Sequence, residues 1–356
     1  MLRVFEAFAG YGSQSIALRN LGIEHEVVAI SEIDKYAIKA YEAIHGPTNN
    51  LGDICKIDPK DIPDHDLFTY SFPCQDLSVA GKQAGLGKGT RSGLLYECEK
   101  VIEAKKPKYL LLENVKNLVG KKFKPQFDKW LEYLENLGYT NYWQVLNTKH
   151  YGVPQNRERV FVVSILGEHK PYKFPKPIPL DKCIADILED EVNEKYYLSE
   201  DIQKRFKITD QTKALIPQAT KKGYIEMDLP GVCDLSYPNS KTRRGRVQEN
   251  GKVSPTLTTA SQDICYIELP CICASRGRNP ENPSDRTAGV PTEQRLEFNT
   301  KGTSNTITTV QKDNYVVEPT FRIRKLTPRE CFRLMGMRDD DIDKIQAAGI
   351  SNTQQY

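Results

Sequence analysis

One cysteine of this 356-residue chain is placed for chemistry rather than for packing. Cys74 lies between Pro73 and Gln75, after an apolar segment that is typical of a strand, and a glycine-rich segment follows it. A thiol at such a position is expected to be exposed, and its thiolate form is a strong nucleophile. A half-buried structural cysteine would fit the same local pattern, so the interpretation depends on the groups that surround the thiol.

A carboxyl group and two guanidinium groups stand at comparable positions in later segments. Glu113 follows the apolar segment of residues 109–112, and Arg157 and Arg159 alternate just before the apolar segment of residues 160–165. Taken singly, such residues are usually surface charges. Together these groups predict a site for covalent catalysis. A nucleophilic thiol, two cations, and a carboxyl group that can hold a proton would all lie at neighbouring strand ends.

A glycine turn near the N-terminus is the first of three features that favour an adenosine-containing cofactor. The turn runs from Phe8 to Gly12 after a short apolar strand, and its glycines let the backbone approach a ligand closely. Glu32 ends the second predicted strand, where a carboxylate can hold ribose hydroxyls. Asp53 ends the third, where it can accept a hydrogen bond from an adenine amino group. A phosphate-binding loop is excluded because no Lys-Ser or Lys-Thr pair follows the glycines.

Alternating strands and helices in the first half of the chain must position these residues. We expect strands at residues 4–8, 26–30, near 52–53, 67–70, 109–112, 141–147 and 160–165, and helices at 13–21, 35–44, 94–105 and 124–137. Strands separated by helices of this length predict an α/β domain with a parallel sheet and helices on both faces. Ligands of such sheets bind at the carboxyl ends of the strands, where we expect all of these motifs to lie.

The composition changes after the proline-rich residues 174–179, which predict a stiff connector and a second, β-rich domain. Two similar segments occur there, 254–259 and 304–309, each downstream of an Arg-Gly-Arg sequence at 244–246 or 276–278. Five basic residues within 241–252 face one acid, which suits contacts with nucleic-acid phosphates. A solvated charged surface is the alternative. A helix is predicted again at residues 327–335.

Composition limits the class of protein. Hydrophobic residues make up 39% of the chain and charged residues 27%, which supports a folded core and excludes a disordered chain. We find no apolar run long enough to span a membrane and no secretory signal, so the nine cysteines predict reduced thiols in the cytoplasm. The net charge of +3 neither requires nor excludes nucleic acid. No metal site is predicted, because Cys271 and Cys273 lack a second pair of ligands nearby.

Together these motifs resemble those of the cytosine-5 DNA methyltransferases, and they span nearly the whole chain in the family's order. The resemblance rests on Phe8-Ala9-Gly10-Tyr11-Gly12, Glu32, Asp53, Pro73-Cys74-Gln75, Glu113-Asn114-Val115, Gln155-Asn156-Arg157-Glu158-Arg159 and Leu326-Thr327-Pro328-Arg329-Glu330. It implies a Rossmann-like, S-adenosylmethionine-dependent methyltransferase domain at residues 1–175 and a smaller β-rich target-recognition domain at 176–320. A C-terminal segment, 321–356, would return to the first domain.

The resemblance implies that the protein methylates carbon 5 of cytosine in a specific duplex DNA sequence. Cys74 would add to carbon 6 of a flipped-out cytosine, which makes carbon 5 nucleophilic toward the methyl group of S-adenosylmethionine. Glu113 would hold a proton at ring nitrogen 3 and the exocyclic amine. Arg157 and Arg159 would bind the pyrimidine oxygen and orient Cys74 and Glu113. Loss of the carbon 5 proton would then expel Cys74.

The remaining site residues also follow from the resemblance. Those implied to bind the cofactor are Phe8, Ala9, Gly10, Tyr11, Gly12, Glu32, Ile33, Asp53, Ile54 and Pro73. Those implied to contact DNA are Gln75, Ser78, Arg91, Arg244, Arg246, Arg276 and Arg278. Residues 76–92 are expected to close behind the flipped base. No metal is implied.

The resemblance also implies partners. We expect a cytoplasmic monomer of a prokaryotic cell, chromosomal or phage-encoded, that acts on double-stranded DNA and has no membrane partner. It would protect DNA as part of a restriction system, with a cognate endonuclease acting on the same sequence, or act as a solitary phage enzyme.

The chain departs from the family at its end, because the closing Gly-Asn segment is missing after residues 351–356. We therefore expect an open methionine side of the cofactor site and a last helix at about 340–348 that no later element holds. The missing segment indicates a truncated sequence, a separate chain that supplies the rest, or a defective enzyme. The alternative functions are a tRNA cytosine-5 methyltransferase and a DNA-binding remnant without activity.

Overall fold

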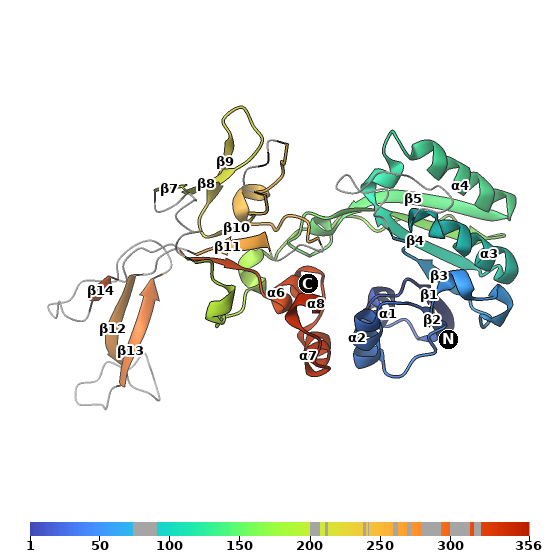
Figure 1. The fold of residues 1–356 in the computed structure, drawn as a ribbon, viewed down its shortest axis with the longest axis horizontal. Coiled ribbons are helices and arrows are strands. Elements are labelled where there is room, and N and C mark those ends of the chain that lie inside the picture. The colour runs from blue at the N-terminus through green and yellow to red at the C-terminus, as the bar shows by residue number, and fades with distance from the viewer. Residues whose placement is uncertain are drawn as a thin grey trace. The chain divides into compact units, whose positions relative to one another are not determined.

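Two groups of contacting elements make up the chain in the computed structural model (Figure 1). It describes residues 1–73, 91–199, 207–210, 213–237, 240, 242–258, 263–268, 272–278, 293–299, 314–316 and 322–355. The first unit consists of Met1–Val153, Arg157–Leu180 and Met335–Gln355, and the second of Pro154–Asn156 and Asp181–Leu334. Residues 322–334 thus lie in the second unit, although the resemblance implies a return from residue 321. The functional boundaries at residues 175 and 320 stay predictions.

A six-stranded sheet in the order β2-β1-β3-β4-β6-β5 is the centre of the first unit. Its strands are β1 (Leu2–Ala7), β2 (His25–Ser31), β3 (Leu67–Tyr70), β4 (Tyr109–Val115), β5 (Tyr139–Asn147) and β6 (Glu158–Leu166). The first four pair in parallel, whereas β6 runs antiparallel to both β4 and β5. The expectation of a parallel sheet is therefore wrong for β6. Residues 148–157 form no α-helix, and without a crossover of that kind β6 returns beside β5 in the opposite direction.

The strand expected near residues 52–53 is also wrong. Only an isolated parallel bridge forms there, between Ile30 and Asn50. Gly52 has a φ of 78°, which turns the backbone out of the extended conformation and into the short 3-10 turn Ile54–Lys56. Asp53 therefore starts a turn instead of ending a strand.

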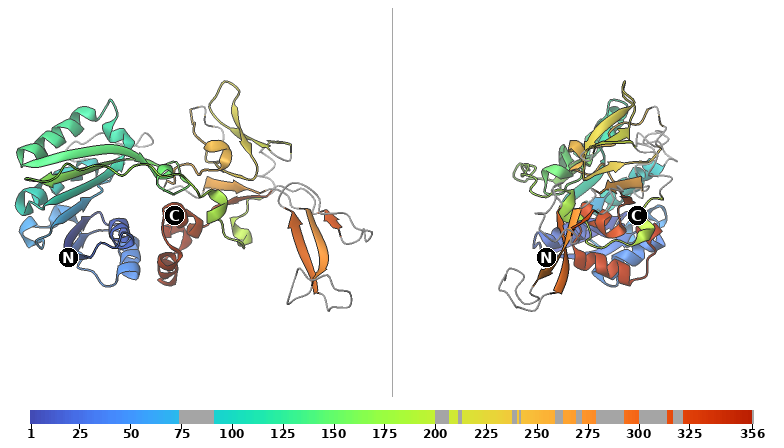
Figure 2. Two further views of the ribbon diagram at one scale, coloured as in Figure 1. Left: turned by 180° about the vertical axis from the view of Figure 1, so that it is seen from behind. Right: turned by 90° about the vertical axis from the view of Figure 1, so that its left-hand side faces the viewer.

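Helices cover both faces of the sheet, as predicted (Figures 1 and 2). Side chains of α3 (Leu95–Lys105) and α4 (Lys124–Asn136) pack on one face, in the main core around Phe68 and Tyr70. On the other face Tyr41 of α2 (Lys35–His45) packs against Ile30 of β2, beside α1 (Ser13–Asn20). Alternate strand residues point to opposite faces, so each strand contributes to both layers.

Local sequence explains where two of these helices begin. The Asp34 side chain accepts hydrogen bonds from the backbone N–H groups of Tyr36 and Ala37, at 2.8 and 3.0 Å, and so caps α2. A proline in the first turn of α4 has no N–H group that would need a partner. Among the described helices, none has the length and apolar character that crossing a membrane requires.

The C-terminal residues of the first unit form α7 (Asp339–Ala347) and α8 (Asn352–Gln355). α7 packs against α2, and its buried Asp341 forms an ion pair with Arg19 of α1. The expectation that no element follows α7 is wrong, because α8 does. Gln355 of α8 is buried and donates a hydrogen bond to the Ile350 carbonyl at 2.6 Å, which folds this end back on itself.

Three small antiparallel sheets, β7-β8-β9, β10-β11-β15 and β13-β12-β14, are described in the second unit. Their strands are β7 (Lys207–Asp210), β8 (Lys213–Pro217), β9 (Tyr224–Asp228), β10 (Gly231–Asp234), β11 (Ile264–Ile267), β12 (Ile272–Arg278), β13 (Glu293–Asn299), β14 (Asn314–Val316) and β15 (Ile323–Lys325). The predicted β-rich character of this region is thus confirmed. The helix predicted at residues 327–335 is also confirmed, as α6 (Pro328–Leu334).

Candidate active site

Antiparallel pairing of β4 and β6 brings the predicted carboxyl and guanidinium groups together. Val115 is paired with Arg159 and Glu113 with Phe161, so Glu113 and Arg159 are diagonal neighbours on one face of the sheet. Arg159 Nε lies 3.1 Å from Glu113 Oε1, and the two side chains are 17% and 26% exposed. In a parallel sheet the start of β6 would lie at the opposite edge, far from the end of β4.

Arg157 lies at the same edge, next to the glycine turn. Its backbone N–H donates to Asn147 Oδ1 at 3.2 Å, which fixes the start of β6 against the end of β5. Burial raises the pKa of the Tyr11 hydroxyl, the charge of Arg157 opposes this rise and the charge of Glu113 adds to it. The Tyr11 ring is therefore within electrostatic reach of both predicted catalytic groups.

Asn114, to which the sequence analysis assigned no role, connects the ends of β3 and β4. Its buried amide donates from Nδ2 to the Phe72 carbonyl at 3.0 Å, and its Oδ1 accepts from the Val115 N–H at 2.9 Å. An amide directly after a run of apolar strand residues is the signal that could have revealed it. The contact holds the residues that lead into Pro73, the last described residue before the predicted nucleophile.

Several predicted site residues, or their side chains, lie outside the part of the chain that the structure describes. Cys74, Gln75 and Ser78 lie outside the described residues, and so does most of the segment 76–92 that is expected to close. Arg91 begins a 3-10 turn, Arg91–Leu94, and Arg276 and Arg278 lie in β12, but only their backbones are described. Their roles stay predictions.

The glycine turn has an unusual backbone conformation at its two ends and at its centre. Phe8, Gly10 and Gly12 all have positive φ, of 56°, 56° and 80°. A Cβ atom at Gly10 would meet no other atom within 4 Å, so the backbone there is open to an approaching group. Glu32 reaches across from the end of β2 and accepts a hydrogen bond from the Gly10 N–H at 2.9 Å. The predicted carboxylate and the predicted turn thus belong to one local structure.

Glu32 also orders the residues that follow it. Its Oε1 accepts from the N–H groups of Ile33 and Asp34, at 2.8 and 2.9 Å. The Ile33 side chain is 73% exposed, which is unusual for a large apolar side chain and leaves it available to a ligand. Ile54, in contrast, has its side chain buried in the main core, so only its backbone could contact a cofactor. Asp53 is partly exposed, and its Oδ1 accepts from the Cys55 N–H at 3.1 Å.

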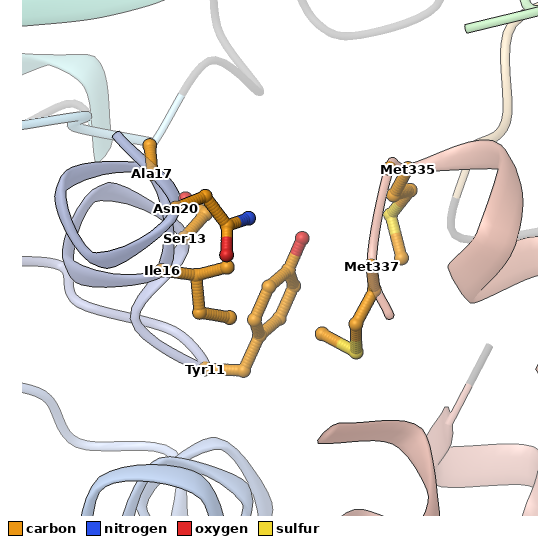
Figure 3. Close-up of a pocket in the computed structure, with 8 residues that line it drawn as sticks. Tyr11, Ser13, Ile16, Ala17, Asn20, Met335 and Met337 are labelled. Atoms are coloured by element: carbon orange, nitrogen blue, oxygen red, sulfur yellow. The ribbon is translucent and has the colours of Figure 1, made fainter. Parts of the chain in front are cut away.

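A small pocket adjoins the glycine turn within the first unit. Its volume is about 130 Å³, and it is lined by Tyr11, Ser13, Ile16, Ala17, Asn20, Met335, Gly336 and Met337. Figure 3 shows the Tyr11 ring between the α1 side chains and the two methionines. Ligand sites for whole cofactors measure roughly 300–1,000 Å³, so this pocket could take only part of one. Met335 and Met337 were not predicted as site residues, because their position in the sequence does not indicate that they lie near α1.

The position of one residue that was predicted to contact DNA does not fit that role. Arg246 is only 1% exposed, and its guanidinium donates to the carbonyl groups of Asp234, Ser236 and Tyr237. It therefore supports the loop that follows β10, and its prediction as a phosphate contact is wrong. Arg244, two residues earlier, is exposed and donates from Nε to the Ala219 carbonyl at 3.0 Å. The order of residues in a basic segment does not show which arginine side chain is buried. Burial depends on carbonyl groups of other segments that can accept its hydrogen bonds.

Two of the family motifs, the one that begins at Gln155 and the one that ends at Glu330, also make structural contacts within the second unit. Gln155 Nε2 donates to the Leu334 carbonyl at 3.1 Å, and the Asn156 N–H donates to the Ser254 carbonyl at 2.8 Å. The first of the two similar segments thus holds the residues that precede Arg157, while the second, 304–309, lies outside the described residues. Glu330 forms a buried, bidentate ion pair with Arg324, with both contacts at 2.8 Å, although the sequence analysis did not single out Arg324.

Curated relatives are named as type II and orphan methyltransferases of bacteria and phages. The chain is 47% identical to the type II methyltransferase M2.ScrFI of Lactococcus lactis subsp. cremoris, over 56% of this chain and 70% of that protein. It is 32% identical to the orphan methyltransferase M.SPRI of Bacillus phage SPR, over 100% of this chain and 93% of the phage protein.

Solved structures share the fold. The S. pombe Dnmt2 methyltransferase matches with a TM-score of 0.57 at 18% identity, over 100% of this chain and 96% of that one. The Entamoeba histolytica methyltransferase EhMeth matches with a TM-score of 0.60, also at 18% identity, over 100% and 92% of the two chains. The predicted α/β methyltransferase fold is confirmed. The family model for C-5 cytosine-specific DNA methylases matches residues 2–356. The chain belongs to this family and is a DNA cytosine-5 methyltransferase.

Proposed function

We propose that this enzyme methylates cytosine in a specific duplex DNA sequence through a covalent bond between Cys74 and carbon 6 of a flipped-out base. The observation that carries the proposal is the contact of 3.1 Å between Glu113 and Arg159 at the edge of the sheet. Asn114 ties the end of β3 to the same edge, two residues before Cys74. Phe72, two residues before the predicted nucleophile, is therefore held against β4, the strand that carries Glu113.

Glu113 and Arg159 would act on the cytosine ring. Arg159 Nε orients one carboxyl oxygen of Glu113, and we propose that the other, Oε2, meets ring nitrogen 3 and holds a proton there. That proton relieves the negative charge that thiolate addition pushes into the ring. Arg157 would bind the pyrimidine oxygen from the start of β6. Water is the simplest acceptor for the carbon 5 proton, after which the Cys74 bond breaks and the ring becomes aromatic again.

We propose that S-adenosylmethionine binds at the glycine turn, where it supplies the methyl group. The residues present suit such a ligand. The backbone at Gly10 is open, the Ile33 side chain is exposed beside Glu32, and Asp53 is accessible at the next loop. Glu32 would hold ribose hydroxyls, Asp53 the adenine amino group, and Ile33 an adenine face. The pocket beside Tyr11 would take the methionine end.

Duplex DNA would be read by the second unit, where Arg244 is an exposed positive charge and the partly exposed Arg243 forms an ion pair with Asp234. Relatives are named type II and orphan methyltransferases, which supports a role in a restriction system or as a solitary enzyme. Their bacterial and phage origin supports action in a prokaryotic cytoplasm. The monomeric state and a separate C-terminal partner chain stay predictions.

Transfer of a labelled methyl group from S-adenosylmethionine to duplex DNA and to tRNA tests this function. Cys74→Ala should abolish transfer to DNA, and Cys183→Ala, which removes an exposed thiol in the second unit, should leave it intact. Transfer to tRNA alone would overturn the choice of substrate. Unchanged transfer in Cys74→Ala would overturn the assignment of the nucleophile.

A further inference from the structure

A buried carboxyl group lies directly beneath the glycine turn, and the proposed mechanism does not use it. Glu6 is in β1 and its side chain is fully buried, with 0% exposure. Its Oε1 accepts hydrogen bonds from the N–H and the hydroxyl group of Ser15, at 3.1 and 3.2 Å. Its Oε2 accepts from the Tyr41 hydroxyl at 2.7 Å. One carboxyl group thus connects β1 with both α1 and α2.

The contact with Ser15 replaces a cap that α1 lacks. The first N–H groups of a helix have no partner within the helix, and a side chain at the preceding residue usually accepts from the second or third of them. In α1 that preceding residue is Gly12, which has no side chain to offer. Ser15 is the third residue of the helix, so Glu6 Oε1 occupies the place of the missing cap.

The cap cannot be moved back to residue 12. Gly12 has a φ of 80°, which disfavours any residue with a side chain. A Cβ atom there would also clash with His45 Nε2 and would lie 2.7 Å from Tyr41 Cε2. Serine, threonine or aspartate is therefore excluded, and the acceptor has to come from another element.

We infer that Glu6 is a positioning residue for the glycine turn, which it holds in a cofactor-binding conformation by capping α1 and anchoring α2. The inference rests on the proposed binding of S-adenosylmethionine at that turn. Glu32 holds the Gly10 N–H from the open side of the turn, and Glu6 holds the beginning of α1 from the buried side. Burial raises the pKa of Glu6, and the hydrogen bonds from Tyr41 and Ser15 oppose the rise. An uncharged acceptor of the same shape should therefore serve nearly as well.

Two substitutions of similar size separate the acceptor from the volume of the side chain. Glu6→Gln keeps an oxygen toward Ser15, whereas Glu6→Met fills the space without one. In the full-length chain, isothermal titration calorimetry would measure the dissociation constant for S-adenosylmethionine, and fluorescence anisotropy that for a duplex oligonucleotide. We expect Glu6→Met to bind the cofactor roughly tenfold more weakly and Glu6→Gln within about threefold of the wild type, with duplex affinity nearly unchanged in both.

Leu134→Ala is the matched control, because Leu134 is fully buried in α4 and belongs to the core on the opposite face of the sheet. It should lower the melting temperature without weakening cofactor binding, which shows that lost stability alone does not produce the effect. Tyr41→Phe removes only the donor to Oε2, and we expect it to fold and to weaken cofactor binding about threefold.

The outcomes separate this inference from the function on which it rests. Equal cofactor affinity in the wild type and Glu6→Met would overturn the role of Glu6 alone. If Glu6→Met does not fold, unchanged cofactor binding in Tyr41→Phe would overturn it instead. A wild-type chain that methylates no DNA and binds no S-adenosylmethionine would overturn the proposed cofactor site together with the inference.

Discussion

Replacing Arg159 tests the geometry on which the proposed chemistry depends. The substitution Arg159→Ala removes the guanidinium that contacts Glu113 Oε1 at 3.1 Å and leaves that carboxyl group free to rotate at the edge of the sheet. A hydrogen bond to a charged group contributes about 1.5–3 kcal/mol. Because the two side chains are 17% and 26% exposed, the lower end of that range applies, and about 1.5 kcal/mol corresponds to roughly tenfold in rate.

Single-turnover methyl transfer to a saturating duplex is the appropriate assay, because it separates the chemical step from binding. We expect a rate at least tenfold lower for Arg159→Ala, with an unchanged dissociation constant for S-adenosylmethionine. Arg159→Lys should recover little of the loss, since a lysine cannot reproduce the planar guanidinium geometry.

A neighbouring ion pair provides the control. Lys116 Nζ lies 2.9 Å from Glu158 Oε1, and these side chains are 57% and 42% exposed. Surface pairs of this kind contribute little, so Lys116→Ala should change the rate by about twofold or less. The reasoning is refuted if Arg159→Ala keeps the wild-type rate, or if Lys116→Ala slows the reaction as much as Arg159→Ala does.

The other predictions concern the remaining groups. Cys74→Ser should abolish turnover but not duplex binding, and DNA with 5-fluorocytosine should trap the wild-type enzyme as a covalent adduct visible on a denaturing gel. Glu113→Gln should slow turnover far more than it weakens cofactor binding, and Asp53→Ala should do the reverse; titration calorimetry beside rate measurements would show the two profiles, and indistinguishable ones would mean that one residue is misassigned. Arg246→Ala should lower the free energy of unfolding by about 3 kcal/mol, because two buried carbonyl groups and one partly buried carbonyl group lose their donor. Arg244→Ala should leave stability unchanged and flatten the salt dependence of duplex binding, as anisotropy at several salt concentrations would show.

The sequence alone was sufficient wherever the cause is local. Residues 67–70 were predicted as a strand and form β3, and Lys35 begins both the predicted and the observed α2. Apolar runs, the capping Asp34 and prolines act within a few residues, so their effect can be derived from the order of residues. The motif residues could also be recognised, because their types suit the chemistry and their order along the chain matches one family.

Tertiary structure decided everything that depends on which segments pair. The direction of β6 brings Arg159 to Glu113, and a strand pattern is the same in either direction. Burial separates Arg246 from Arg244, although both stand in the same basic run. The cap of α1 comes from Glu6, which reaches Ser15 across the glycine turn. In each case the partner is chosen by the packing of distant segments, and that information appears only when the chain is folded.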